Sequence, residues 1–217
     1  MSRKLSPQFM QELSAGYLKP LLDRVKFDQT LMLAIRDGYI NVYYRGGSLL
    51  KLEEQKQREM GYSCFFDKNY IKQHNELIKY LPIGDQSIHK LPTCVCTEED
   101  CEKWVKAIPY LKLIMDLYFG VKNKPEREFQ QLVVRENNSS TISNNSEYFI
   151  TDIEYATDRD LNARFDMVGV RWLSSDRSKM GALRPVLVEM KYADDAIGED
   201  AGIKDHLDDI HTFLSDP

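Results

Sequence analysis

Three residues in the last third of the 217-residue chain have the types and spacing of a reactive site. Asp166 lies in the segment RFDMVGVRW, and Glu189 and Lys191 lie in the segment VLVEMKY. Side chains alternate between the two faces of a strand, so Glu189 and Lys191 point the same way. If the two segments pair as antiparallel strands, Asp166 can lie opposite Glu189. The sequence therefore predicts two carboxylates and one ammonium group at the end of a β-hairpin.

These residue types match the chemistry of phosphodiester hydrolysis. The reaction requires charge on the phosphate to be neutralised and a hydroxide to form near neutral pH, and a divalent ion held by carboxylates does both. Hard oxygen ligands favour Mg²⁺ or Mn²⁺ over zinc. A lysine beside the metal can orient water or stabilise developing negative charge. A Glu-x-Lys pair alone is more often a solvated strand face, but the apolar residues before both carboxylates favour a site.

A regular order of elements surrounds these segments. Pro125 and EREFQQLVVREN predict a helix, and three strands follow, namely EYFITDIEYAT, NARFDMVGVRW and RPVLVEMKY. The segment AGIKDHLDDIHTFL predicts a last helix, with one apolar face formed by Ile203, Leu207, Ile210 and Leu214. The expected fold class is mixed α and β (α/β or α+β), with a helix–three strands–helix core on the C-terminal side.

A strand ending in hydrophobic-Asp, a polar turn and a strand reading hydrophobic-Glu-x-Lys resemble the PD-(D/E)xK nuclease superfamily, which has the restriction-endonuclease-like fold. The resemblance implies that Asp166 and Glu189 bind Mg²⁺ or Mn²⁺ and that Lys191 positions or activates the attacking water. It also implies a core of a helix, three antiparallel strands, a helix and a further strand. Phe165 stands where the family has proline. Because the sequence ends at Pro217, soon after the second helix, we expect either a truncated domain without the last strand or a fold that closes in another way.

The resemblance further implies a metal contact from a glutamate of the first helix. Glu128 precedes Phe129 and lies one turn from Leu132, which places it at the edge of the expected buried face. We therefore expect Glu128 to be the third metal ligand and the fourth catalytic residue. Glu126 and Glu136 are the alternatives.

Four other polar residues have weaker patterns. Asp152 and Glu154 share one face of the preceding strand, and they either extend the acidic site or, as we expect, form a solvated face. Lys204 and His206 on the last helix are candidate substrate-binding residues, because they could approach nucleic-acid phosphate. The alternatives are a solvent-facing histidine and a lysine that balances neighbouring acids.

The expected domain boundary lies between residues 97 and 98. We expect residues 1–97 to form an accessory region and residues 98–217 to form the nuclease-like domain. Thr97 and Asp100 are typical of a helix N-cap, so a helix is expected from Glu98 to about Tyr118.

The accessory region predicts a helix followed by an antiparallel β-meander. The helix spans roughly Pro7–Val25, and the pairs Asp37-Gly38 and Gly46-Gly47 indicate hairpin turns. The segment GYSCFF is a further expected strand, and a short helix is expected over 75–80. The aromatic residues of the meander could stack bases, although a small core is the default interpretation; this group is Tyr39, Tyr43, Tyr44 and Arg45.

Cysteines and charge exclude several classes of protein. Cys94 and Cys96 could form a zinc site with His89 and Cys101, but the spacing differs from the common CxxC pattern, so reduced thiols are expected. A net charge of −5 argues against coating nucleic acid through bulk charge. No apolar run approaches the ~20 residues needed to cross a bilayer. The N-terminus lacks a signal-peptide core, so we expect a cytoplasmic protein without a membrane partner.

The leading interpretation is an Mg²⁺-dependent nuclease that acts on DNA, with a defence or repair role by analogy alone. Cutting both strands of a duplex needs two sites, so a homodimer or a partner protein bound through the N-terminal region is expected. The alternative is a catalytically inactive nuclease-fold protein that binds nucleic acid or protein.

Overall fold

The computed structural model describes residues 3–55, 61–72, 90–122, 124–156, 164–178, 183–192 and 202–215. The chain divides into two compact units, Ser2–Lys124 and Pro125–Pro217. Each unit combines helices with one antiparallel sheet, so the expected mixed α and β class is confirmed. Among the described residues, no helix has both the length and the apolar character needed to cross a membrane.

The first unit contains a five-stranded antiparallel sheet in the order β1-β2-β3-β4-β5. The predicted meander is confirmed as β1 to β3, and GYSCFF supplies β4. Its first hairpin turns at Gly38, and its second at Arg45 and Gly46, where φ is positive. The helix expected over 75–80 lies outside the described residues. The elements are α1 (Pro7–Ala15), α2 (Lys19–Phe27), β1 (Leu31–Ile35), β2 (Tyr39–Tyr44), β3 (Gly47–Glu54), β4 (Tyr62–Phe65), α3 (Asn69–Lys72), β5 (Cys94–Val95) and α5 (Glu98–Val121).

The single helix predicted over Pro7–Val25 is wrong, because α1 and α2 are separate helices. Gly16 has an extended backbone (φ −103°, ψ −155°), which ends α1. The Glu12 carboxylate accepts a hydrogen bond from the Tyr17 N–H at 3.0 Å and so satisfies a backbone donor at the break. Pro20 then lies in the first turn of α2, where its missing N–H costs nothing.

The long helix α5 belongs to the first unit. The Thr97 hydroxyl accepts a hydrogen bond from the Asp100 N–H at 3.2 Å, which confirms the predicted N-cap. The buried face of α5 packs into the hydrophobic core of the sheet and of α1 and α2. The boundary between the units therefore follows Lys124 and not Thr97 as expected. The buried residues of α5 are Cys101, Trp104, Ala107, Ile108, Leu111, Ile114, Met115 and Phe119.

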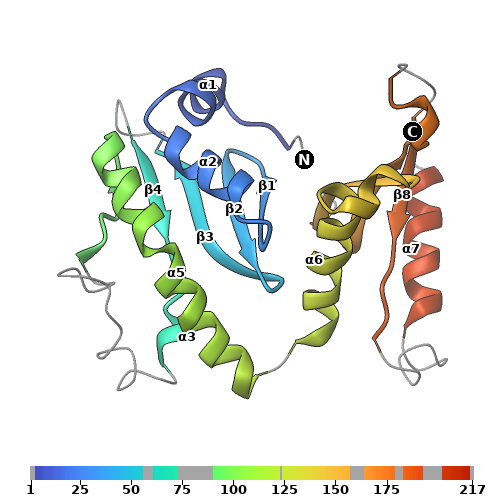
Figure 1. Ribbon diagram of the computed structural model, residues 1–217. Coiled ribbons are helices and arrows are strands. Elements are labelled where there is room, and N and C mark those ends of the chain that lie inside the picture. The colour runs from blue at the N-terminus through green and yellow to red at the C-terminus, as the bar shows by residue number, and fades with distance from the viewer. Residues whose placement is uncertain are drawn as a thin grey trace. The chain divides into compact units, whose positions relative to one another are not determined.

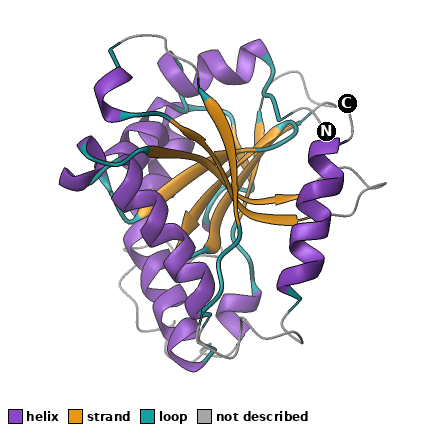
Figure 2. Cartoon of the chain, turned by 90° about the vertical axis from the view of Figure 1, so that its right-hand side faces the viewer, coloured by secondary structure: helices purple, strands orange, loops and turns teal. Residues whose placement is uncertain are grey.

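The second unit contains a three-stranded antiparallel sheet in the order β6-β7-β8. Figure 1 shows this sheet between α6 and α7, and in Figure 2 α7 is a continuous helix beside the strands. The predicted order of helix, three strands and helix is confirmed, but the third strand ends at Val188, so Glu189 and Lys191 follow the strand that was expected to contain them. The elements are α6 (Pro125–Asn138), η2 (Thr141–Asn144), β6 (Tyr148–Ala156), β7 (Arg164–Arg171), η3 (Ser174–Asp176), β8 (Arg184–Val188) and α7 (Ile203–Ser215).

The two faces of this sheet are covered by different helices. Phe165 and Met167 of β7 are buried on one face, where the Phe213 ring of α7 lies 5.1 Å from the Phe165 ring. Asp166 points to the opposite face by strand alternation. On that face, Arg127 of α6 contacts Glu154 of β6. The candidate residues therefore lie on the α6 side of the sheet.

Only half of the predicted apolar face of α7 packs. Ile203 and Ile210 are half-buried, whereas Leu207 and Leu214 are 57% and 65% exposed. Phe213 contacts the sheet instead, and His206, two turns earlier, lies near Glu189. The packed side of α7 is therefore shifted toward Phe213, because this large aromatic ring makes the contact with the sheet in place of the two leucines.

Candidate functional site

Asp166 of β7 lies level with Glu189, which directly follows the end of β8. β7 pairs with β8 through Met167↔Val188, and the next pair in the same register is Asp166 and Glu189. The Asp166 Oδ2 atom accepts a hydrogen bond from the Met190 N–H at 2.8 Å. This bond holds the Asp166 carboxylate against the segment that follows β8, so the predicted hairpin brings the two carboxylates together.

Glu189 is the centre of the polar group. Its Oε1 atom lies 2.7 Å from the Lys191 Nζ atom and 3.3 Å from the His206 Nε2 atom. The Glu189 and Lys191 side chains are only 9% and 13% exposed. The Glu189 Oε2 atom is buried and has no hydrogen-bond partner in the described part of the chain. A buried acceptor without a partner costs free energy, and a cation, a water molecule or another hydrogen-bond donor would satisfy this oxygen.

Burial and neighbouring charges change the proton affinity of this group. Burial raises the pKa of Glu189 above its ordinary value, and the charge of Asp166 acts in the same direction against the opposing bond from Lys191. Burial is the largest single influence on Lys191 and lowers its pKa, but the bond to Glu189 and the neighbouring negative charges together outweigh burial and raise that pKa. The charges of Asp166 and Glu126 add to the rise. The acidic and basic side chains are thus electrostatically coupled.

Helix α6 presents a polar face to the sheet. Its buried residues are Gln130, Gln131 and Val134, whereas Phe129 and Leu132 are 43% and 37% exposed. The buried face predicted from these two apolar residues is therefore wrong. The Phe129 ring instead stacks on Tyr192 beyond β8, with centroids 5.2 Å apart.

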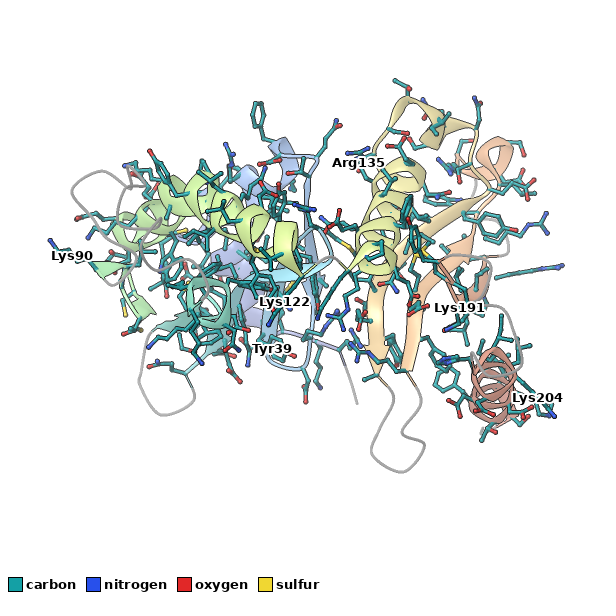
Figure 3. All side chains as sticks on the ribbon, turned by 90° about the horizontal axis from the view of Figure 1, so that it is seen from below. Tyr39, Lys90, Lys122, Arg135, Lys191 and Lys204 are labelled. Atoms are coloured by element: carbon teal, nitrogen blue, oxygen red, sulfur yellow. The ribbon has the colours of Figure 1, made fainter. Side chains whose placement is uncertain are left out.

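The three candidate glutamates of α6 have different surroundings. Glu126 lies one turn before the buried Gln130, and its charge acts on Lys191. Glu136 accepts two hydrogen bonds from Arg135, at 3.0 Å and 2.9 Å, and Figure 3 shows Arg135 on the side of α6 away from Lys191. Glu128 is partly buried. The charge of Glu126, an alternative from the sequence, thus acts on a residue of the site.

The acidic residues of β6 are not the solvated face that we expected. The Asp152 residue is 7% exposed and the Glu154 side chain 11% exposed. The Asp152 Oδ1 atom accepts a hydrogen bond from the Ile153 N–H at 2.8 Å. The solvated interpretation fails because α6 covers this side of the sheet, which a single strand pattern cannot reveal.

The two candidates on α7 have different surroundings. The His206 imidazole lies beside Glu189, although its side chain is still 35% exposed to solvent. Lys204 is exposed, and in Figure 3 it lies on the outer side of α7, away from Lys191. The structure therefore brings His206, but not Lys204, to the carboxylates.

The cysteines form no recognisable metal centre. Among the described residues, no group of three or more His, Cys, Asp or Glu side chains could hold a metal ion. His89 lies outside these residues. The Sγ atoms of Cys94 and Cys96 are 3.2 Å apart, and Cys101 is buried as expected, with burial raising its thiol pKa to about 11.

The aromatic residues of the meander contribute to the first unit's own packing. Tyr43 is 8% exposed. The Tyr44 hydroxyl donates a hydrogen bond to the Asp116 Oδ1 atom at 3.0 Å, and Arg45 pairs with the same carboxylate at 2.8 Å. The Lys51 ammonium lies over the Tyr39 ring, 4.2 Å from its centroid. These contacts favour the default interpretation of a small core over base stacking.

Two arginines that the sequence did not single out contact the α6 side of the sheet. Arg127 of α6 and Arg164 of β7 both form ion pairs with Glu154. Arg164 precedes Asp166 by two residues and so shares its strand face. That spacing was the only signal available in the sequence.

Comparison with known proteins gives no match, since no family model, no curated protein and no solved structure shows significant similarity to the chain.

Proposed function

We propose that the chain is a metal-dependent nuclease that hydrolyses phosphodiester bonds in DNA. The observation that carries this proposal is the grouping of Asp166, Glu189 and Lys191 where β7 and β8 meet. Ionisable groups buried inside a β-hairpin cost free energy, and perturbed groups of this kind gather at functional sites. The combination of two carboxylates and an ammonium group fits hydrolysis of a charged ester.

The residues fit an Mg²⁺ or Mn²⁺ ion. Asp166 and Glu189 supply hard oxygen ligands, and the unpartnered Oε2 atom of Glu189 is an acceptor that a cation would satisfy. Mg²⁺ is usually held by one or two carboxylates, with water and phosphate oxygens completing its shell. A group of three carboxylates is therefore not required. When bound, the ion would neutralise phosphate charge and lower the pKa of a coordinated water.

The chain's own groups provide orientation and a hydrogen-bond donor. The Met190 N–H fixes one oxygen of Asp166, and Lys191 fixes one oxygen of Glu189. Such outer contacts orient metal ligands. The Lys191 ammonium can donate to the attacking water or to a phosphate oxygen. His206 shares the Glu189 oxygen and can support the same orientation.

We infer a restriction-endonuclease-like core for the second unit. The support is the element order of α6, β6, β7, β8 and α7, the antiparallel order of the strands, and the helices on opposite faces. The candidate residues lie where the second and third strands of such a core meet. Fold alone does not establish function, so the proposal depends on the side chains.

Removal of the metal is the primary test. We expect the protein to cleave plasmid and single-stranded DNA with Mg²⁺ or Mn²⁺, to lose this activity after chelation with EDTA, and to regain it with excess metal. Product formation is followed on gels, with RNA of matched sequence as a second substrate. Equal cleavage with and without EDTA would contradict metal dependence. Metal-independent DNA binding without any cleavage would instead support the inactive binding protein.

The identity of the helix carboxylate is tested by a pair of substitutions. We expect Glu126→Gln to lower the cleavage rate by about 10- to 100-fold, the effect typical of groups that tune a metal site. Glu128→Gln, which changes the charge of the same helix equally, should have little effect. Both rates are measured at several metal concentrations. The reverse order of the two effects would restore Glu128 as the residue expected from the sequence.

A further inference from the structure

Glu154 is the strand neighbour of the proposed catalytic residues. β6 pairs with β7 through Ile153↔Met167 and Tyr155↔Phe165, which places Glu154 across from Asp166 in the same register. Glu154 therefore shares the α6 side of the sheet with Asp166. Its carboxylate is 11% exposed, so it needs compensating positive charge.

Two arginines from different elements supply that charge. The Arg127 Nε atom lies 3.4 Å from the Glu154 Oε1 atom, and Arg164 pairs with the Oε2 atom. The arginine side chains remain 37% and 57% exposed. A guanidinium carries more N–H donors than one shared carboxylate can accept. Arg127 and Arg164 are thus held by the buried Glu154 carboxylate, and each guanidinium keeps N–H donors that Glu154 does not use.

The backbone at Glu154 is also unusual. Its φ is 52°, a conformation that L-residues other than glycine rarely adopt. Among the described residues, the other non-glycine residue with positive φ is Arg45, which occupies a hairpin turn. Glu154 instead lies within β6. Strain of this kind persists where the surrounding structure imposes it, and it is common at functional sites.

We propose that Arg127 and Arg164, anchored on Glu154, bind a backbone phosphate of the nucleic acid beside Asp166 and Glu189. This inference rests on the proposed nuclease function and specifies how its substrate is held. The α6 side of the sheet carries several carboxylates, which repel a polyanion unless cations are placed among them. The guanidinium fork matches the geometry of phosphate oxygens, and the exposed donors allow two-point contact.

Binding is measured separately from cleavage by using Asp166→Asn as the parent protein. Fluorescence anisotropy with a labelled DNA oligonucleotide gives the affinity at several salt concentrations. We expect Arg127→Gln and Arg164→Gln each to weaken binding about tenfold, and each to reduce the salt dependence by about one released counterion. Arg127→Lys should give an intermediate affinity, because it keeps the charge but loses the fork.

Two matched controls come from the same elements. Arg135 of α6 pairs with Glu136, and Arg171 of β7 pairs with Glu147, so Arg135→Gln and Arg171→Gln remove the same charge elsewhere. Binding equally weakened by all four glutamine variants, unchanged in all of them, or absent in the parent would overturn the inference. Wild-type protein that binds through the two arginines but never cleaves would overturn only the nuclease proposal. Circular dichroism of each variant verifies folding.

Discussion

Replacement of Asp166 by asparagine is expected to lower the rate of metal-dependent DNA cleavage by about 10³-fold or more, while the protein stays folded. The asparagine amide keeps an oxygen that can accept the hydrogen bond from the Met190 N–H, but it lacks the charge that would hold the metal. A catalytic metal contributes several kcal/mol of transition-state stabilisation, and each ~1.4 kcal/mol corresponds to a tenfold change in rate. Single-turnover cleavage at saturating metal measures the loss.

A matched substitution separates this effect from a change in net charge. Asp205 is exposed in the first turn of α7, so Asp205→Asn removes one negative charge without disturbing the carboxylate pair. We expect that variant to cleave DNA at the wild-type rate. If Asp166→Asn also retained the wild-type rate, the metal site would have to lie elsewhere in the chain.

The hairpin that carries Asp166 and Glu189 could be predicted because its determinants are local. Strand alternation predicted that Glu189 and Lys191 share a face, and the polar connection between the two segments favoured an antiparallel pair. Both residues follow the end of β8 at Val188, but their side chains still lie together. The observed register, with Met167 opposite Val188, then brings the carboxylates to the same level. The pairing that brings Asp166 and Glu189 together therefore involves only neighbouring segments of the chain.

The buried face of α6 could not be predicted in the same way. The sequence rule assigns apolar residues to the core, and it selected Phe129 and Leu132. That rule assumes an apolar surface below the helix. The sheet face under α6 instead carries Asp152 and Glu154, and the Arg127 guanidinium makes a contact there while Gln130 and Gln131 are buried. Which residues of α6 are buried therefore depends on the sheet surface beneath the helix. For this reason we now favour Glu126 over Glu128 as the helix carboxylate of the site.

The position of α5 shows a second limit of local patterns. Its N-cap at Thr97 and its apolar stripe were evident in the sequence, but they do not identify the sheet on which the helix packs. Contacts such as Tyr44 with Asp116 join residues far apart in the chain. Because these contacts are with the first sheet, α5 belongs to the first unit. The boundary between the two units therefore follows Lys124.

Replacement of Lys191 by methionine separates metal binding from chemistry. Methionine keeps much of the length of the side chain but removes the ammonium that lies 2.7 Å from Glu189. We expect cleavage to fall by about 10²- to 10⁴-fold, the range for loss of a positioned proton donor or acceptor. The metal ligands remain, so metal should still raise the melting temperature. Saturation at about 100 times the Kd corresponds to roughly 2.7 kcal/mol of stabilisation.

Comparison with Asp166→Asn distinguishes a loss of metal binding from a loss of chemistry. That variant should lose both cleavage and the metal-induced rise in melting temperature, whereas Lys191→Met should lose cleavage alone. Lys204→Met removes the same charge from an exposed site that faces away from Lys191 (Figure 3), and it should behave as wild type. Wild-type cleavage by Lys191→Met would mean that the lysine only balances the buried charge of Glu189. In that case water activation would fall to the metal and its two carboxylates alone.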